Sequence, residues 1–237
     1  IVIVHPTEEE GYIVIFATGA YLRTGDSTDS EIQSIYGLWD RLGPGLIQKS
    51  DLQVQSYTNV SDAFGKVRTL SDDDVDYSVS VVGAQRGWYN DLDAAAPGEL
   101  PGSAPEFPGE RAVRNIQLRG GLAFVNSIFP REVGSCVGRA GGATLAFCPD
   151  TGGSLCLGER TVFDLDNDGE FDADDDIVSD SGRTAAGIIL EDPAPPTDST
   201  FIENKRVTQY GRELHIIGTN TSTGKTQAAC HGSVWKL

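Results

Sequence analysis

Short apolar or alternating runs recur along the whole chain, and each run is bounded by Gly, Pro, Asn or Asp. Such runs predict strands of stacked antiparallel sheets, because alternation places apolar side chains on one face and turn residues end each strand. The sequence therefore predicts an all-β fold, either a sandwich or a propeller. The predicted strands span residues 12–16, 52–57, 77–82, 112–118, 122–128, 144–147, 187–190, 205–210 and 214–217.

One segment does not follow this pattern. Apolar residues recur there with roughly helical spacing after a serine that suits a helix N-cap, in the series Ser30, Ile32, Ile35, Trp39 and Leu42. Gly37 in the middle weakens a helix. The residues alone leave helix and strand open for this segment.

Two stretches are predicted to be loops because they are rich in proline. Residues 94–109 contain four prolines and residues 191–200 contain three. Proline lacks the backbone donor that a sheet ladder needs, so neither stretch fits a central strand. Neither is long enough to prove a domain boundary, and we expect residues 1–237 to form a single domain.

The charge balance and the length of the apolar runs exclude a nucleic-acid partner and a membrane span. The chain has 35 acidic and 18 basic residues, a net charge of −17. A surface of this sign repels phosphate backbones, so we expect no nucleic-acid partner. No apolar run approaches the ~18 residues that a bilayer span requires, so we expect no membrane span.

The start of the chain and its cysteines suggest an exported protein. The chain has no methionine and opens on the strand-like run Ile1-Val2-Ile3-Val4, so we expect a piece whose N-terminal part is missing. An even number of cysteines without C-x-x-C spacing favours disulfides and an oxidising compartment over four reduced thiols.

The cysteine spacing suggests one pairing among several. Cys148 and Cys156 bracket a turn-rich link that suits a closed hairpin, which would leave Cys136 to pair with Cys230. Four cysteines allow three connectivities, and the sequence alone leaves them open.

The most specific motif is an acidic loop. Between Glu159 and Asp180 lie ten acidic residues and one arginine, a net charge of −9. Oxygen-bearing side chains alternate there, with Gly169 at the sixth position of the motif, and this spacing wraps a loop around one hard cation. Ca²⁺ is the expected ion. The predicted ligands are Asp164, Asp166, Asp168, Glu170, Asp172 and, at the twelfth position, Asp175.

The surroundings of the motif differ from those of an EF-hand. Short β-type runs flank it, at Thr161-Val162-Phe163 and Ile177-Val178, which predicts a calcium loop between strands. The alternative is a solvated acidic loop. Two carboxylates ~4 Å apart repel by about 1 kcal/mol in water and about 4 kcal/mol at an effective dielectric of 20, which favours a bound ion. A second acidic cluster, residues 72–76, lacks both glycine and alternation and predicts no site.

No catalytic constellation stands out. The three histidines are His5, His215 and His231, and no G-x-S-x-G elbow, Walker loop or dinucleotide fingerprint accompanies them. His215 lies in an apolar run that fits a strand. We therefore expect a non-enzyme.

The sequence leaves two other functions open. One is a secreted calcium-stabilised hydrolase that uses two carboxylates. The other is a lectin-like carbohydrate-binding module with Trp88 or Tyr89 exposed beside the ion. Core packing is the stronger expectation for Trp39 and Trp88, as for most aromatic residues of strand-rich chains.

Several strings follow one another along the chain: residues 12–22 with Asp26, Gln33-Ser-Ile-Tyr36-Gly37-Leu-Trp39-Asp40, Arg86-Gly87-Trp88-Tyr89-Asn90-Asp91-Leu92, Gly109-Glu110-Arg111-Ala-Val113, residues 124–130 with Cys136, and Ser233-Val-Trp235-Lys-Leu237. In this order they resemble the C-terminal propeller domain of the PilY-type family of type IV pilus tip adhesins and assembly factors. The resemblance spans most of the chain and implies a strand at residues 32–39.

The resemblance also implies a function and a location. It implies a surface-exposed β-propeller at the tip of bacterial type IV pili, exported through the periplasm and involved in pilus extension, retraction and adhesion. The implied partners are minor pilins of the tip complex and a host or abiotic surface. Family members bind Ca²⁺ through an Asp-rich loop, and the matching positions are Asp164, Asp166, Asp168 and Asp172, with Glu170 between them. We expect these 237 residues to cover only the later blades of the propeller.

Overall fold

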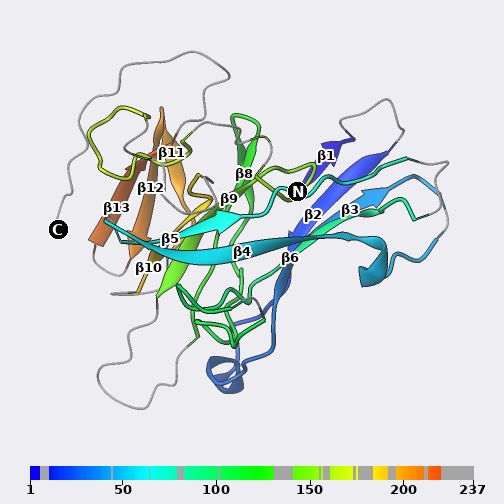
Figure 1. The fold of residues 1–237 in the computed structure, drawn as a ribbon, viewed down its shortest axis with the longest axis horizontal. Coiled ribbons are helices and arrows are strands. Elements are labelled where there is room, and N and C mark those ends of the chain that lie inside the picture. Colours follow the sequence, from blue (N-terminus) through cyan, green and yellow to red (C-terminus); the bar gives the residue numbers. More distant parts are fainter. Residues whose placement is uncertain are drawn as a thin grey trace.

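Nearly all of the regular secondary structure consists of β-strands (Figure 1). A computed structural model describes residues 1–5, 11–43, 45–63, 65–78, 83–100, 102–130, 141–154, 156, 161–172, 175, 184–191, 196–210 and 213–219. Within these residues thirteen strands and two 3-10 turns occur, and no α-helix. The predicted all-β class is confirmed.

The strands are short, as the sequence predicts. The two 3-10 turns are η1 (Thr24–Ser27) and η2 (Lys49–Asp51). The strands are β1 (Val2–Val4), β2 (Tyr12–Ala17), β3 (Ser34–Asp40), β4 (Gln53–Asp62), β5 (Gly65–Leu70), β6 (Gly87–Asp91), β7 (Gln117–Arg119), β8 (Leu122–Asn126), β9 (Gly142–Phe147), β10 (Gly187–Leu190), β11 (Thr200–Ile202), β12 (Lys205–Tyr210) and β13 (Glu213–Gly218).

Ten strands form one curled sheet in the order β1-β2-β3-β6-β4-β5-β10-β9-β8-β7. Strand β4 joins its two halves. Residues 53–56 of β4 pair in parallel with β6, and residues 57–62 pair antiparallel with β5. The remaining strands, β11, β12 and β13, form a separate antiparallel sheet. In Figure 1 this sheet lies at the opposite end of the molecule from β1, β2 and β3.

Trp88 on β6 is a central core residue and is wholly buried. Its ring lies between two glycines: a Cβ on Gly37 or on Gly152 would come within 2.2 Å of Trp88 ring atoms. Gly152 also has φ +69°, a left-handed conformation that glycine adopts without strain. Trp39 is 1% exposed, so the predicted core packing of both tryptophans is confirmed.

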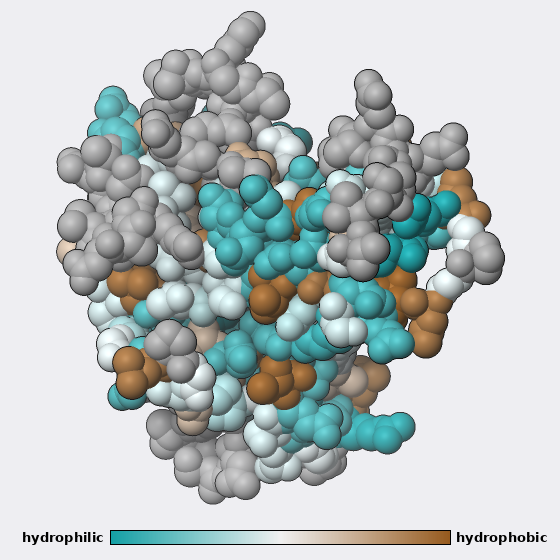
Figure 2. All heavy atoms as spheres, turned by 45° about the vertical axis from the view of Figure 1, so that its right-hand side comes forward, coloured by the Kyte–Doolittle hydropathy of each residue, from teal (hydrophilic) through white to brown (hydrophobic). Residues whose placement is uncertain are grey.

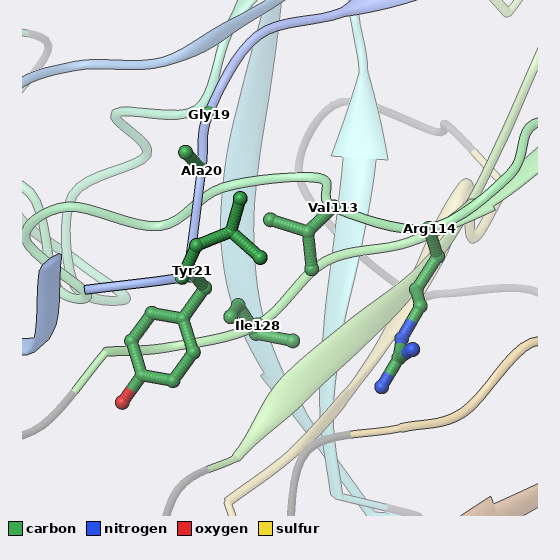
Figure 3. A pocket seen from close by; sticks show the side chains of 7 residues that line it. Gly19, Ala20, Tyr21, Val113, Arg114 and Ile128 are labelled. Atoms are coloured by element: carbon green, nitrogen blue, oxygen red, sulfur yellow. The ribbon is translucent and has the colours of Figure 1, made fainter.

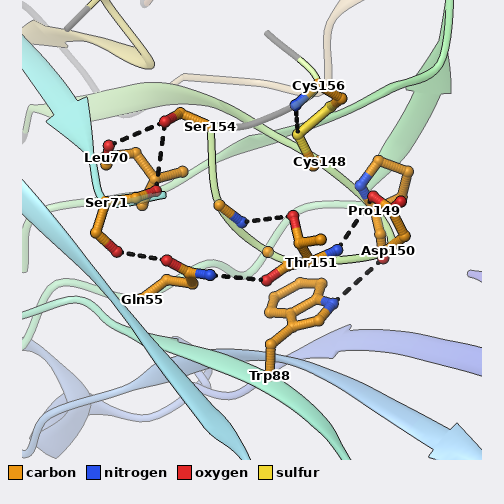
Figure 4. The surroundings of a disulfide bond; sticks show 12 residues. Gln55, Leu70, Ser71, Trp88, Cys148, Pro149, Asp150, Thr151, Ser154 and Cys156 are labelled. Carbon is orange, nitrogen blue, oxygen red and sulfur yellow. Dashed lines mark hydrogen bonds between the residues drawn. A yellow bond between two sulfur atoms is a disulfide. The ribbon is translucent and has the colours of Figure 1, made fainter. Parts of the chain in front are cut away.

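A disulfide between Cys148 and Cys156 closes the loop that contains Gly152 (Figure 4). This is the pairing suggested by the sequence; Cys136 and Cys230 lie outside the described residues. The closed loop is held to the strands beside it, because Trp88 Nε1 donates to the carbonyl of Pro149 (3.3 Å) and Gln55 Nε2 donates to that of Thr151 (3.1 Å). Closing a loop of this size typically contributes about 2–4 kcal/mol to stability.

A buried ion pair connects the proline-rich loop to the sheet. Arg68 on β5 donates two hydrogen bonds of 2.7 Å to the carboxylate of Glu110, and both side chains are 1% exposed. Ser127 also donates to Glu110 (2.5 Å), and Arg68 Nε donates to Asn59 (2.7 Å). The two charges are therefore paired, which a buried charge requires. As predicted, residues 94–109 form no strand where the structure describes them.

The structure decides between helix and strand for the ambiguous segment. Residues 34–40 form β3, as the family resemblance implies. The helical spacing was misleading because the segment is buried on alternate residues, with Ile35, Gly37 and Trp39 facing the core.

Some predicted strands are wrong. Of the predicted strand 77–82, Tyr77 and Ser78 lie outside any strand, and residues 79–82 lie outside the described part. The Ser78 N–H donates to the carboxylate of Asp76, two residues earlier, in place of a neighbouring strand. Of the predicted strand 112–118, only the end enters β7. Strand β5 was missed because its pattern includes Lys66 and Arg68, whose charges do not suggest a buried strand.

We predict that Glu110→Ala lowers the free energy of unfolding by about 3–5 kcal/mol, because it leaves the Arg68 guanidinium buried without its counter-ion. Denaturant titration followed by tryptophan fluorescence measures this. Lys49→Ala is the control: it removes an exposed pair with Asp91 and should cost about 0–1 kcal/mol. Equal losses in the two variants would contradict the importance of the buried pair.

Candidate metal centre

The acidic loop lies between β9 and β10 and is attached to β13. Phe163 forms an isolated antiparallel bridge with Thr219, and the Asp164 N–H donates to the Gly218 carbonyl (3.2 Å). Phe163 is fully buried in the core. The first residue of the motif is therefore held against the end of a strand, and the following residues turn outward.

Three carboxylates of the motif converge. Oxygen atoms of Asp164, Asp166 and Asp168 all lie within 4.8 Å of one another. Asp164 is buried, whereas Asp166 and Asp168 are exposed. The alternating sequence pattern thus brings one buried and two solvent-facing acids to the same point.

Backbone N–H groups shape the turn between these acids. Asp168 N donates to Asp166 Oδ1 (3.0 Å), and Gly169 N donates to Asp164 Oδ2 (3.2 Å). Gly169 has φ +93° and Asn167 has φ +62°, so the chain reverses sharply at this point. A glycine suits the first of these conformations, because its missing Cβ removes the steric penalty. This is the turn that the motif predicts.

Asp175 closes the loop from its other end. Its Oδ1 accepts from the N–H groups of Leu165 (2.5 Å) and Asp166 (3.4 Å), and the residue is 2% exposed. Burial raises the pKa of Asp175 to about 6, against the lowering effect of the backbone donors and with a further increase from the charge of Asp164. The side chain therefore braces the start of the loop.

Asp164 provides the test of whether a cation fits. Its Oδ1 is buried and has no hydrogen-bond donor among the residues that the structure describes. Burial raises the pKa of Asp164, and the charges of Asp166 and Asp168 raise it further, while N–H groups of Asn167 and Gly169 lower it. A cation among the three carboxylates would give Asp164 Oδ1 a partner and offset the repulsion between the negative charges. The atoms that could bind the cation are all oxygens, which suits a hard cation such as Ca²⁺ or Mg²⁺ and not zinc.

The other predicted ligands are not part of this cluster. Glu170 and Asp172 are exposed, and the carbonyl of Asp172 accepts from Asp175 N (3.3 Å). Their roles as ligands, and that of Asp175, stay predictions. Ile177-Val178 and the neighbouring acids Asp174 and Asp176 lie outside the described residues.

Gly218 was not identified from the sequence as part of this centre. A Cβ at Gly218 would come within 2.8 Å of Asp164 Cβ and Oδ2, so only glycine leaves room for the carboxylate. The sequence signal was weak: Gly218 ends an apolar run 54 positions after Asp164, and only the tertiary fold brings the two together.

A surface pocket of about 350 Å³ lies elsewhere in the molecule (Figure 3). Val113 and Ile128 form apolar walls, and the side chains of Tyr21 and Arg114 lie on opposite sides in the view. The residues that line this pocket include no acid, so it holds no carboxylate pair of the kind that glycosidases use. His215 lies in β13, as predicted, and burial lowers the pKa of its imidazole.

None of the helices in the described residues is long and apolar enough to cross a membrane.

Comparison with known proteins identifies relatives of the chain. The type IV pilus biogenesis factor PilY1 of Pseudomonas aeruginosa PAO1 is 30% identical over 187 residues, which cover 73% of this chain and 15% of that protein. A PilY1 homolog of Xylella fastidiosa is 30% identical over 158 residues, which cover 66% of this chain and 11% of that protein. The chain thus spans only a small part of the length of these two relatives.

A scan against protein-family models finds no match.

A solved structure shares the fold. The crystal structure of the P. aeruginosa PilY1 C-terminal domain matches with a TM-score of 0.70 and 23% identity, covering 94% of this chain and 44% of that one. This likeness confirms the β-propeller among the predicted all-β classes. With the sequence relationship, it shows that the chain belongs to the PilY1 family of type IV pilus biogenesis factors, in the region of the C-terminal domain.

Proposed function

We propose that the protein containing these residues acts in the assembly of type IV pili and sits at the pilus tip, outside the cell. The sequence relationship to PilY1 proteins carries this proposal, because those relatives are pilus biogenesis factors. In this role the chain contacts minor pilins of the tip complex and takes part in extension, retraction and attachment to a host or abiotic surface.

We further propose that the acidic loop binds one Ca²⁺ ion. The single observation that supports it is the buried Asp164 Oδ1, which has no donor among the described residues and lies beside two other carboxylates. Ca²⁺ accepts six to eight oxygen ligands in flexible geometry, whereas Mg²⁺ demands a strict octahedron and keeps several waters. A turn of alternating carboxylates and backbone carbonyls suits the larger ion.

The role of the ion is structural. Asp164 is hydrogen-bonded to the end of β13, and Asp175, near the other end of the loop, accepts from the N–H of Leu165 beside Asp164. An ion among the carboxylates therefore ties the connection between β9 and β10 to the three-stranded sheet. Because Ca²⁺ would bind the folded chain alone, it adds about 2.7 kcal/mol of stability at a hundredfold excess over its dissociation constant.

The two alternative functions receive less support. The pocket near Tyr21 has no acidic lining residue for a hydrolase. For a lectin-like module, Trp88 or Tyr89 would have to be exposed beside the ion; Trp88 is fully buried, and the partly exposed ring of Tyr89 stacks on Tyr36. We assign no catalytic role to the chain.

We predict that Ca²⁺ raises the melting temperature of the chain and that excess chelator reverses the increase. Asp166→Asn should abolish most of the effect, because it removes one of the converging charges while the amide oxygen keeps the bond from Asp168 N. Differential scanning calorimetry measures both. Asp74→Asn, in the exposed acidic cluster, makes the same charge change elsewhere and should leave the response to calcium intact. An equal loss in both variants would show that calcium acts through general charge screening.

Ion selectivity is a separate prediction. At equal millimolar concentrations, Mg²⁺ should raise the melting temperature by less than half as much as Ca²⁺, because it surrenders its waters reluctantly. Titration calorimetry with each ion, under the same ionic strength, checks this. Equal responses would argue against a calcium loop.

In cells, deletion of the gene should reduce the number of surface pili and abolish pilus-dependent movement on agar, and the intact gene should restore both. Complementation with the Asp166→Asn gene separates the two proposals. Restored pili with reduced attachment would limit calcium to adhesion, whereas unchanged pili after deletion would overturn the role in assembly. Electron microscopy and sheared-pilin quantification provide the counts.

A further inference from the structure

A group of hydrogen-bonded polar side chains lies on one face of strands β4 and β5, which run side by side in Figure 1. Many hydrophilic residues of this protein lie at its surface, as the face drawn in Figure 2 shows. Within the group, in contrast, Asn59 is 2% exposed and Arg68 1%, and the side chains of Glu106 and Lys66 are 13% and 34% exposed. The amide is therefore shielded from water, and the lysine lies at the edge of the group.

The strand register places Asn59 and Lys66 on the same face. Asn59 on β4 is directly opposite Arg68 on β5, and Lys66 precedes Arg68 by two residues. Because alternate residues of a strand point to one face, Lys66 is a diagonal neighbour of Asn59. A long side chain reaches across such a diagonal pair. The lysine amine can therefore approach the Asn59 amide.

One carboxylate holds the amine and the amide together. Lys66 Nζ donates to Glu106 Oε1 (2.5 Å), and Asn59 Nδ2 donates to Glu106 Oε2 (2.8 Å). Because the two acceptor oxygens belong to one carboxylate, the two nitrogen atoms are neighbours at the same group. Lys66 Nζ also donates to Glu191, which has no hydrogen bond to Asn59.

The oxygen of the same amide faces a cation. Arg68 Nε donates to Asn59 Oδ1 (2.7 Å), while the Ala94 carbonyl accepts from Asn59 Nδ2 (3.3 Å), so these partners fix the orientation of the amide. Arg68 is held in place by its two hydrogen bonds to Glu110. A guanidinium at a carbonyl oxygen stabilises the negative charge that develops there when a nucleophile attacks the carbon.

Aromatic rings lie beside these groups. Phe107 is 7% exposed and stacks on Phe129 with 3.9 Å between ring centroids. Lys66 Nζ lies 5.7 Å from the centre of the Phe107 ring, and the guanidinium carbon of Arg68 lies 5.9 Å from it. Apolar surroundings exclude water and strengthen the electrostatic contacts of the amine and the amide.

We propose that Lys66 and Asn59 form an intramolecular isopeptide bond. Lys66 Nζ, as the free amine, attacks Asn59 Cγ; a bond forms between these two atoms, the bond from Cγ to Nδ2 breaks, and ammonia leaves. Glu106 takes one proton from Nζ and delivers it to Nδ2, since its two oxygens contact both nitrogen atoms. Arg68 stabilises the amide oxygen during the attack. The reaction occurs once within the chain and needs no oxidant, cofactor or second substrate.

The lysine loses a proton before it attacks. Hydrogen bonds to Glu106 and Glu191 raise the pKa of Lys66 and outweigh the opposite effect of desolvation, so the ammonium form predominates at neutral pH. The same contacts place two carboxylates where they can accept this proton. The extra proton leaves with ammonia as an ammonium ion, which balances the reaction. We therefore expect the bond to form slowly after the chain has folded.

The bond would join two neighbouring strands covalently. Strand β4 connects the two halves of the curled sheet, and its last six residues pair with β5. A covalent link between the strands restricts the unfolded chain and so favours the folded state. The inference rests on the contacts around Glu106 and is independent of the calcium and pilus proposals.

Mass spectrometry of the denatured and reduced protein tests the bond. We expect an intact mass about 17 Da below that of the sequence, which is the mass of one ammonia. Trypsin should fail to cut after Lys66, so that residues 50–68 are recovered as one peptide with the same deficit. This second measurement is needed because a succinimide at Asn59 also loses ammonia but leaves Lys66 open to trypsin.

Three variants identify the groups that react. Lys66→Arg keeps the positive charge but supplies no amine, and Glu106→Gln removes the carboxylate that contacts both nitrogen atoms; both should show the full sequence mass. Glu191→Gln is the matched control: it removes a carboxylate that contacts the lysine alone, and the deficit should remain.

The melting temperature gives a second readout. Lys66→Arg should lower it by more than about 5 °C, because the link is lost while the charge stays, whereas Glu191→Gln should lower it by about 1 °C or less. If Glu106→Gln does not fold, Lys66→Arg still separates the covalent bond from the ion pair.

Three results would overturn the proposal. The full sequence mass in the unaltered protein after long incubation at neutral pH would show that hydrogen bonds alone hold the group. A deficit with normal cleavage after Lys66 would assign the loss of ammonia to Asn59 by itself. A deficit that persists in Glu106→Gln would show that this carboxylate does not transfer the proton.

Discussion

The packing of Trp88 between two glycines is the contact on which much of the fold depends. The ring is contributed by β6, one glycine by the neighbouring strand β3 and the other by the disulfide-closed loop that follows β9. A side chain at either glycine would collide with the indole, so the contact requires three distant segments to be correct together. It joins the half of the curled sheet that contains β3 and β6 to the connection that leads to the acidic loop. The disulfide between Cys148 and Cys156 limits the freedom of the loop that supplies Gly152 and so supports the same contact.

The sequence predicts local features of this molecule well and distant ones poorly. The motif from Asp164 onward could be identified because its acidic residues lie within one short segment, and a turn with Gly169 follows from the spacing. The contribution of Gly218 could not, because it depends on how β13 passes the loop. Strand β5 was missed for a related reason: Arg68 is compatible with burial only because Glu110, 42 positions later, neutralises it. The order of the ten strands was equally beyond reach, since the parallel pairing of β4 with β6 leaves no local signal.

Two independent devices restrain the long connection between β9 and β10. Near its start, the disulfide holds a loop against Trp88; further along, the acidic loop is hydrogen-bonded to β13. The first is covalent and suits an oxidising environment outside the cell. The second carries a concentration of negative charge that folding alone leaves unbalanced, since burial raises the pKa of Asp164 and of Asp175. A cation among these carboxylates would balance this charge, and this is why we propose a metal site in the loop.

Strand β4 has a mechanical consequence. Its first four residues belong to one half of the curled sheet and its last six to the other, with no loop between them. The two halves are therefore joined by one unbroken strand. A load applied along β4 is resisted as shear through the ladders on its two sides, where many hydrogen bonds share it. Such a load would pass from one half of the curled sheet to the other through β4 itself.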